Sequence, residues 1–385
     1  MNINPDPYSR VSPGLKQIIQ KEEVFFDIHA HIFTSKDVPD GFLGIRIPFN
    51  QRFLKYLEHK LHGVFRRTDT DTLSNLAYFI NFFRNKSSKE TASQLMTYYP
   101  IKNFIFCPLM MDMSPGIKGE IIDDYDSQIE KMREIRNEYP QNILPFFAAD
   151  PNNPKMTENF LKVFSSEKDY NFFGVKIYPS LGYLPSHPKL MKIYKLCEKY
   201  NIPVTAHCAG ASVHASRKRI GDIPGIKYIP GEGFVERNFS KKFYRKNDYA
   251  NFFNHPQNWI PVLEKFPKLK LNLAHFGGDK EWKKFLSGKS DSDTWVSWII
   301  DLMKRFPNLY SDFSYTLYNT EASEKLKTLI TENKTIASRV LYGSDYYMIV
   351  REGHFRNLKS HFTSLMGDTI MKKIAEENPR KFLFV

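Results

Sequence analysis

Short hydrophobic runs rich in β-branched and aromatic residues recur along the chain, separated by polar segments in which apolar residues have helical spacing. Runs of the first kind predict buried strands, and segments of the second kind predict amphipathic helices. The segments 127–140 and 188–201 are clear helix candidates. The runs that fit the strand pattern cover residues 24–29, 104–110, 143–149, 172–178, 202–207, 269–275, 309–313 and 339–345.

The alternation of strands and helices predicts parallel βαβ units, and this number of units favours a closed (β/α)8 TIM barrel. An open doubly wound sheet is the alternative, although no glycine-rich GxGxxG turn follows the first run. Two gaps are much longer than one crossover helix, about 32–103 after the first run and about 208–268 after the fifth. We expect both insertions over the face where the strands end, within a single domain spanning residues 1–385.

Composition narrows the class of protein. No apolar run reaches the roughly 20 residues that span a bilayer, and the first residues carry no secretory signal, so no membrane association is expected. Cys107, Cys197 and Cys208 lie far apart without CxxC spacing. This pattern favours reduced, mostly buried thiols and a cytoplasmic location.

The formal net charge of +13 is concentrated in the two expected insertions. Residues 41–100 and residues 211–255 each contain nine Lys or Arg and four Asp or Glu, a net of +5 apiece. A basic rim around a pocket would attract an anionic small molecule, whereas the plainer interpretation is a solvated lysine-rich surface. No basic–aromatic alternation points to nucleic acid, so no nucleic-acid partner is expected, and a homodimer is compatible with the sequence.

The pair His29 and His31 ends the first predicted strand. Side chains two residues apart on a strand share a face, so both imidazoles should project together and could ligate one divalent ion. Asp27 should lie on the same face, one layer deeper, and orient a ligand or a neighbouring strand. The histidine pair alone is weak support for a metal site, because paired histidines also arise by chance.

Other chemistry-bearing residues fall at the ends of other predicted strands. His207 ends the fifth, His275 the sixth and Asp345 the eighth, and Lys176 lies near the end of the fourth. On a barrel these residues converge on the face that forms active sites. Burying so many polar groups is costly without partners, and a metal ion with a substrate would supply them.

Six motifs occur in order between residues 24 and 385: FDIHAHIF, GVKIYPSLGYLP, VTAHCAG, NWIPVLEKFPKLKLNLAHFGG, LYGSDYY and ENPRKFLF. They resemble the amidohydrolase-2 branch of the amidohydrolase superfamily, which includes aminocarboxymuconate semialdehyde decarboxylase and related metal-dependent hydrolases. The resemblance does not extend to the two insertions.

The resemblance implies roles for these residues. His29, His31, His207 and Asp345 would ligate one divalent ion, Zn²⁺ as is usual in the branch or Mn²⁺ as in related enzymes. His275 would be a catalytic histidine beside the metal rather than a ligand, and Asp345 would also act in catalysis.

Lys176 has three interpretations. Elsewhere in the superfamily a lysine on the fourth strand is carboxylated and bridges two metals. Here we expect a cation that lines the site and binds a substrate carboxylate or Asp345, and a purely structural ion pair is the third reading. Asp150 and Asp312 are expected to orient ligands or cap loops, and Cys208 is expected to pack away from the metal.

Three functions follow. The first is hydrolysis of a small carboxylate-bearing amide, ester or lactone, in which the metal lowers the pKa of water, Asp345 moves the proton and His275 polarises the carbonyl. The second is non-oxidative decarboxylation of an aromatic or enoic acid at the same site. The third, a non-catalytic binding protein, predicts absence of metal and salt-sensitive binding to nucleic acid.

Overall fold

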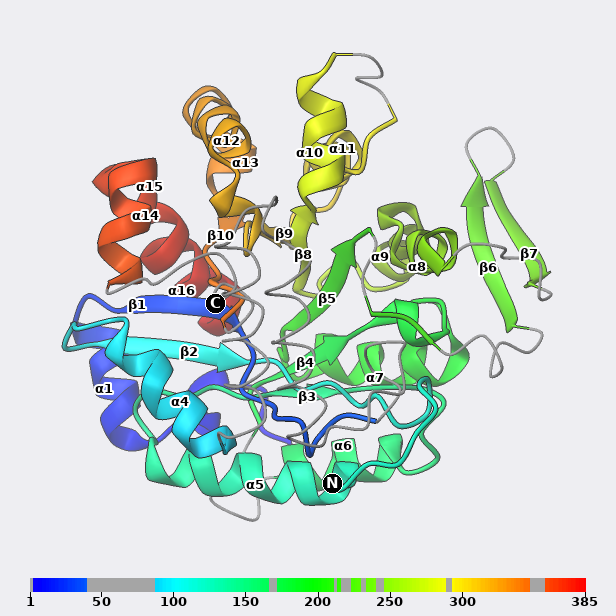
Figure 1. Cartoon of the computed structure of the whole chain (residues 1–385), viewed down its shortest axis with the longest axis horizontal. Helices are drawn as coiled ribbons and strands as arrows, with labels where there is room; N and C mark the ends of the chain where they lie inside the picture. Colours follow the sequence, from blue (N-terminus) through cyan, green and yellow to red (C-terminus); the bar gives the residue numbers. More distant parts are fainter. Residues whose placement is uncertain are drawn as a thin grey trace, which may run out of the picture.

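The computed structural model describes residues 3–39, 87–165, 172–210, 213–215, 223–229, 233–239, 246–288, 293–346 and 357–385. Parallel strands surrounded by helices make up its body (Figure 1). These strands are β1 (Phe25–Ala30), β2 (Phe104–Pro108), β3 (Phe146–Ala148), β4 (Gly174–Ile177), β5 (Val204–Ala209), β8 (Leu271–Gly277), β9 (Leu309–Asp312) and β10 (Val340–Leu341).

The strands form a TIM barrel in the expected order. β1 pairs with β2, and β10, β9, β8, β5, β4 and β3 form a second run of neighbours. Two sets of hydrogen bonds join these runs. Leu144 N, just before β3, donates to Phe106 O of β2 (3.0 Å), and Asp345 N, just after β10, donates to His29 O of β1 (2.8 Å). The chain therefore returns to its first strand after the last one.

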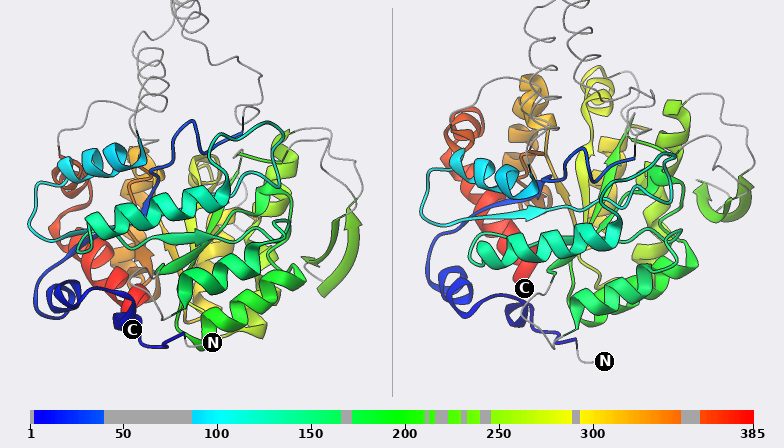
Figure 2. Two further views of the ribbon diagram at one scale, coloured as in Figure 1. Left: turned by 90° about the horizontal axis from the view of Figure 1, so that it is seen from below. Right: turned by 60° about the horizontal axis from the view of Figure 1, so that its bottom comes forward.

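Helices follow most strands and cover the outside of the barrel, as two further views show (Figure 2). The structure confirms the eight expected strand runs and the two clear helix candidates, which are α5 and α7. The helices are α1 (Pro13–Lys21), α4 (Ser88–Thr97), α5 (Tyr125–Glu138), α6 (Met156–Phe164), α7 (Pro188–Lys199), α8 (Lys246–Asn254), α9 (Ile260–Lys265), α10 (Asp279–Leu286), α11 (Trp295–Arg305), α12 (Thr320–Glu332), α13 (Lys334–Ala337), α14 (Leu358–Met366), α15 (Asp368–Lys372) and α16 (Asn378–Phe384). Short 3-10 turns are η1 (Pro7–Arg10), η2 (Pro179–Leu181), η4 (Pro256–Trp259) and η5 (Thr316–Tyr318), and η7 (Lys373–Glu377) is a π-helical turn.

Local sequence explains where the helices begin. Ser87 and Glu90 form a capping box at the start of α4, and Asp124 accepts from Ser127 N at the start of α5. Asn319 caps α12 in the same way, through Ala322 N. These side chains accept from backbone amides that have no partner within the helix, which fixes the residue where each helix begins.

Aromatic residues close the end of the barrel opposite the strand carboxyl termini. Phe384 of α16 stacks on Tyr8 with ring centroids 5.1 Å apart and lies 5.0 Å from Phe173, just before β4. Phe26 of β1 belongs to the same buried cluster. The candidate polar site residues therefore lie at the opposite end, where the strands have their carboxyl termini.

The second insertion contains an antiparallel hairpin that the sequence pattern did not predict, β6 (Ile223–Ile229) paired with β7 (Gly233–Phe239). The hairpin lies at the periphery of the molecule, outside the barrel strands (Figures 1 and 2). In the first insertion, residues 40–86 lie outside the described residues, as does much of the expected basic rim. No helix in the described ranges combines the length and apolar character that crossing a membrane requires.

Candidate metal and substrate site

Side chains from separate strands meet at the carboxyl end of the barrel. His29 lies on β1, Lys176 on β4, His207 on β5 and His275 on β8, while Asp345 follows β10. All of them are buried. The structure thus gathers at one end the residues that the sequence placed at separate strand ends.

His29, His31 and Asp345 form the first group of potential ligands, whose ligand atoms lie within 4.8 Å of one another. The Nε2 atoms of His29 and His31 lie 3.6 Å and 3.4 Å from Asp345 Oδ1. Two nitrogens and one carboxylate oxygen are a donor set suited to Zn²⁺ or Mn²⁺. His29 Nε2 has no hydrogen-bond partner among the described residues, as expected of an atom that awaits a ligand.

The opposite nitrogen of each ring is bound to an acceptor. His29 Nδ1 lies 3.1 Å from Asp312 Oδ2, and His31 Nδ1 lies 3.0 Å from the carbonyl oxygen of Leu109. Because both partners accept hydrogen bonds, Nδ1 of each ring carries a proton and Nε2 of each ring faces Asp345. Burial, followed by the nearby His29 and Lys176, lowers the pKa of His31 well below its usual value, so this ring is neutral.

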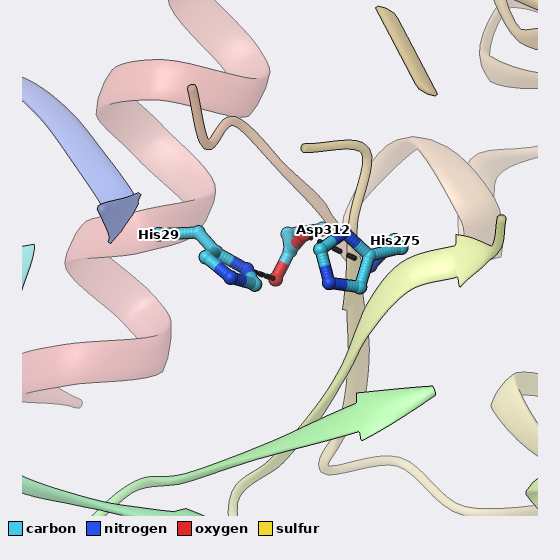
Figure 3. A group of neighbouring side chains, drawn as sticks. All are labelled: His29, His275 and Asp312. Carbon is cyan, nitrogen blue, oxygen red and sulfur yellow. Dashed lines mark hydrogen bonds and ion pairs between the residues drawn. The ribbon is translucent and has the colours of Figure 1, made fainter. Parts of the chain in front are cut away.

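Asp312 lies between His29 and His275 and belongs to a second group of potential ligands with these two histidines (Figure 3). Its oxygens also accept from His275 N (3.0 Å) and from Asn272 Nδ2 (2.7 Å). Burial raises the pKa of Asp312, but His29, His275 and the hydrogen bonds from the side chains of His29 and Ser314 outweigh it and hold the pKa well below the usual range. Both oxygens of this ionised carboxylate already accept hydrogen bonds from protein groups. Asp312 therefore orients His29, in agreement with its expected role.

His207 and His275 are hydrogen-bonded to each other. His275 Nε2 lies 3.1 Å from His207 Nδ1, and the ring of Tyr178 stacks on His207 with centroids 4.3 Å apart. Burial lowers the pKa of His275 to about 3 and that of His207 well below its usual value, so both rings are neutral. His207 Nε2 is buried without a partner among the described residues, but neither group of potential ligands includes His207. Three of the four predicted ligands thus come together, and His207 lies beside the predicted catalytic histidine.

Strained backbone positions two of these side chains. His275 has φ +66° and Asp345 has φ +55°, values that residues other than glycine rarely adopt. Gly343, two residues before Asp345, packs directly against His29. A Cβ atom on Gly343 would lie only 2.5 Å from His29 Cβ. Such strain is typical of functional sites, where the surrounding packing maintains it.

Lys176 supplies the cation of the site. Its Nζ atom is buried without a hydrogen-bond partner among the described residues and lies 5.8 Å from the centroid of the Tyr178 ring. Burial lowers the pKa of Lys176 to about 8, although Asp312 and Asp345 favour the charged form. Burial also raises the pKa of Asp345, which His29 and Lys176 oppose.

The expectation that Asp27 shares a face with His29 is wrong. Asp27 Oδ2 accepts from the hydroxyl of Tyr99, which follows α4 outside the barrel, whereas His29 faces Asp312. The reason is a shift in the register of β1 against β2 between Asp27 and Ala30. Asp27 still orients its surroundings, because Oδ1 accepts from His29 N (3.2 Å) and Ser344 N (2.9 Å).

Ser314 and Asn272 are site residues that the sequence reasoning missed. Ser314 Oγ lies 3.1 Å from His29 Nδ1 and 2.9 Å from His275 Nδ1, and it donates to Asp312. Its position two residues after Asp312 was a usable signal. Asn272 gives no comparable signal, because it occurs in the middle of an apolar strand.

The sequence model of a family described as amidohydrolase matches residues 124–385. No curated protein matches the chain.

All three cysteines are free and buried, as expected for thiols that pack rather than react.

Several solved structures share the fold at low sequence identity. An uncharacterised TIM-barrel protein from Bordetella bronchiseptica has a TM-score of 0.52 at 16% identity, covering 93% of this chain and 98% of the other. The 5-carboxyvanillate decarboxylase from Novosphingobium aromaticivorans, with manganese and a nitrobenzoic acid, has a TM-score of 0.53 at 11% identity and covers 100% of both chains. A dihydroxybenzoic acid decarboxylase from a Polaromonas species, with manganese and 2-nitroresorcinol, has a TM-score of 0.51 at 12% identity and covers 94% of this chain and 97% of the other.

Proposed function

The chain belongs to the amidohydrolase family, and from that premise we propose that it is a metal-dependent hydrolase of small carboxylate-bearing amides, esters or lactones. The observation that carries the proposal is the convergence of the His29 and His31 Nε2 atoms on one oxygen of Asp345, at 3.6 Å and 3.4 Å. Hydrogen bonds on the opposite side of each ring hold Nδ1 and orient both Nε2 atoms toward Asp345.

His29, His31 and Asp345 would hold one divalent ion, Zn²⁺ or Mn²⁺, with His207 as a further ligand through its unpartnered Nε2. A bound ion of this kind lowers the pKa of water toward neutrality and makes hydroxide available at physiological pH.

Asp345 is the proton carrier in this proposal. Burial raises its pKa, so the carboxylate can take a proton from water and return it to the leaving group. His275 lies beside it, but Ser314 occupies Nδ1 and His207 occupies Nε2 of this ring. To polarise a substrate carbonyl, His275 would have to exchange its bond to His207 for the substrate.

Lys176 would bind the carboxylate of the substrate. A buried ammonium group without an acceptor is unfavourable, and a substrate carboxylate supplies the acceptor and the opposite charge. The substrate would then lie with its anionic group toward β4 and its reacting bond near Asp345.

Decarboxylation of an aromatic acid is the second candidate. It is favoured by the names of the two decarboxylases of similar fold, which were solved with manganese and aromatic ligands. The same Lys176 would hold a carboxylate, and Asp345 in its protonated form would be the proton source for the carbon that loses carbon dioxide.

Product analysis tests both candidates. Protein loaded with Zn²⁺ or Mn²⁺ is incubated with a panel of lactone acids, amide acids and hydroxybenzoates, and acid or amine release is measured beside carbon dioxide release. We expect turnover that disappears, together with bound metal, in His29→Ala and Asp345→Ala. The control His361→Ala lies on α14, outside the site, and should keep both. Unchanged metal content in the two site variants would refute the metal centre.

A further inference from the structure

We propose that Ser314 is a positioning residue that fixes which nitrogen carries the proton on His275 and, through His275, on His207. Ser314 lies just after β9 and is completely buried. Its hydroxyl oxygen lies within hydrogen-bond distance of the Nδ1 atoms of both His29 and His275. The inference deepens the proposed function, because the proton positions decide whether His207 can bind a metal.

The hydroxyl has one proton, and its destination is determined by Asp312. Ser314 Oγ donates to Asp312 Oδ1, an oxygen that also accepts from the backbone amides of His275 and Ser314. The oxygen of Ser314 must therefore accept from its other neighbours. These are the Nδ1 atoms of His29 at 3.1 Å and of His275 at 2.9 Å.

The direction of the next bond follows from this. His275 carries its proton on Nδ1, where the carbonyl oxygen of Ser314, at 3.4 Å, is a second acceptor. His275 Nε2 then has a lone pair and must accept from His207 Nδ1, 3.1 Å away. His207 consequently has no proton on Nε2, the buried atom without a partner.

Ser314 thus governs a ring that it does not touch. Without its hydroxyl, His275 has only the distant carbonyl to hold its proton on Nδ1. The opposite arrangement becomes accessible, in which His275 Nε2 donates to His207 Nδ1 and the proton of His207 moves to Nε2. A protonated Nε2 cannot bind a metal ion.

Nitrogen-15 NMR of the metal-free, full-length protein with labelled histidines tests the proton positions directly, since the two nitrogens of a neutral imidazole differ in chemical shift. Resonances of His207 and His275 are assigned from His207→Gln and His275→Gln. We expect Nδ1–H on both rings in the wild type and a second population with Nε2–H in Ser314→Ala. Ser314→Thr retains a hydroxyl and should retain the wild-type pattern.

Ser311→Ala is the matched control. Ser311 is a buried serine on β9, three residues before Ser314, and its hydroxyl donates to the carbonyl oxygen of Leu273 rather than to a histidine. Its loss should leave both rings unchanged. Nε2–H on either ring of the wild type, or identical spectra for wild type and Ser314→Ala, would overturn the inference.

Metal affinity, measured by competition with a chelator, gives the second readout. Loss of a residue that orients a ligand typically weakens metal binding about 10- to 100-fold, and we expect this for Ser314→Ala but not for Ser311→Ala. Wild-type protein that binds no metal would refute the proposed function, while the NMR result would still decide the role of Ser314. Altered proton positions with unchanged affinity would refute the link from Ser314 to the metal.

Discussion

Two lysines are buried without an acceptor among the described residues, at opposite ends of the strands. Lys176 lies on β4 near Asp345, and Lys270 immediately precedes β8 at the end where the strands begin. Burial lowers the pKa of Lys176 to about 8, and burial with nearby Arg10 lowers that of Lys270 to about 7. The first lysine has carboxylates nearby and a proposed ligand, whereas the second has another cation as its neighbour.

Replacing Lys176 should weaken the binding of carboxylates. A hydrogen bond between charged groups contributes about 1.5–3 kcal/mol, so Lys176→Met should raise the Kd of a hydroxybenzoate about 10- to 100-fold, measured by calorimetry on metal-loaded protein. Because the pKa of Lys176 is about 8, wild-type affinity should also fall as the pH rises through this value. The exposed Lys195→Met is the control, and equal affinities of wild type and Lys176→Met would contradict the assignment.

Lys270 should make stability depend on pH. Its pKa falls from 10.5 in the unfolded chain to about 7, so between these values unfolding takes up a proton and the free energy of unfolding rises with pH. The slope is about 1.4 kcal/mol per pH unit. Urea unfolding at pH 7 and pH 9 should show a rise about 2 kcal/mol larger for wild type than for Lys270→Met.

The exposed Lys268→Met, in the same turn, should behave like wild type in this experiment. Equal slopes for wild type and Lys270→Met would mean that Lys270 keeps its proton in the folded protein.

At the scale of elements, the ends of β1 and β10 fit against each other without spare room. A Cβ atom on Gly343 would lie 2.5 Å from His29 Cβ and 3.2 Å from Ser314 Cβ. Neither atom is the free end of a flexible side chain, so the strands themselves would have to separate. The spacing between His29 and Asp345 depends on the absence of a side chain at this position.

Gly343→Ala should therefore weaken metal binding more than 10-fold, because it moves His29 away from Asp345, and should lower the free energy of unfolding by about 1–3 kcal/mol. Chelator competition and urea unfolding measure the two effects. Gly288→Ala is the comparison: this glycine has φ +64° and no atom within 4 Å of an added Cβ. It should lose stability through backbone strain and keep its metal affinity. Unchanged affinity in Gly343→Ala would contradict the tight fit.

Periodicity predicted the barrel well because its strands are apolar on both faces and alternate with amphipathic helices. It did not predict β6 and β7, which lie in a polar insertion. At the site, strand ends identified His29, His207, His275 and Asp345 as residues of one face. The register shift in β1 that separates Asp27 from His29 depends on pairing with a strand far along the chain, and no local pattern shows it.

The distance between His207 and the group formed by His29, His31 and Asp345 also depends on how distant strands pack, so the sequence pattern could not predict it. Similar histidines at strand ends gave no indication that His275 would hydrogen-bond to His207. Ser314 could have been found, because residues two apart at the end of a strand project together.

For the whole molecule, the proposed metal site lies where the ring of strands closes. His29 and His31 belong to the first strand region and Asp345 follows the last, and Asp345 N donates to His29 O across this seam. A metal held by both sides would bind the folded barrel and not the unfolded chain. Its binding energy would therefore add to the stability of the closed ring.

Metal should accordingly raise the melting temperature. At a free concentration about 1,000 times the Kd, binding adds about 4 kcal/mol to the free energy of unfolding. Thermal unfolding with Zn²⁺ and after chelation should differ by several degrees in wild type and not in His29→Ala. Hydrogen exchange should slow most in β1 and β10. Equal melting temperatures with and without metal would contradict a site at the seam.

The position of the proposed site at the seam also means that its ligands are synthesised at very different times. The ribosome delivers His29 and His31 early, and Asp345 only after more than three hundred further residues have been made. A nascent chain therefore contains His29 and His31 long before Asp345 is added. With only two of the proposed ligands, it would bind metal weakly. If the proposed site binds metal, loading would be a late event in biosynthesis, and a chain arrested before β10 would lack the Asp345 ligand.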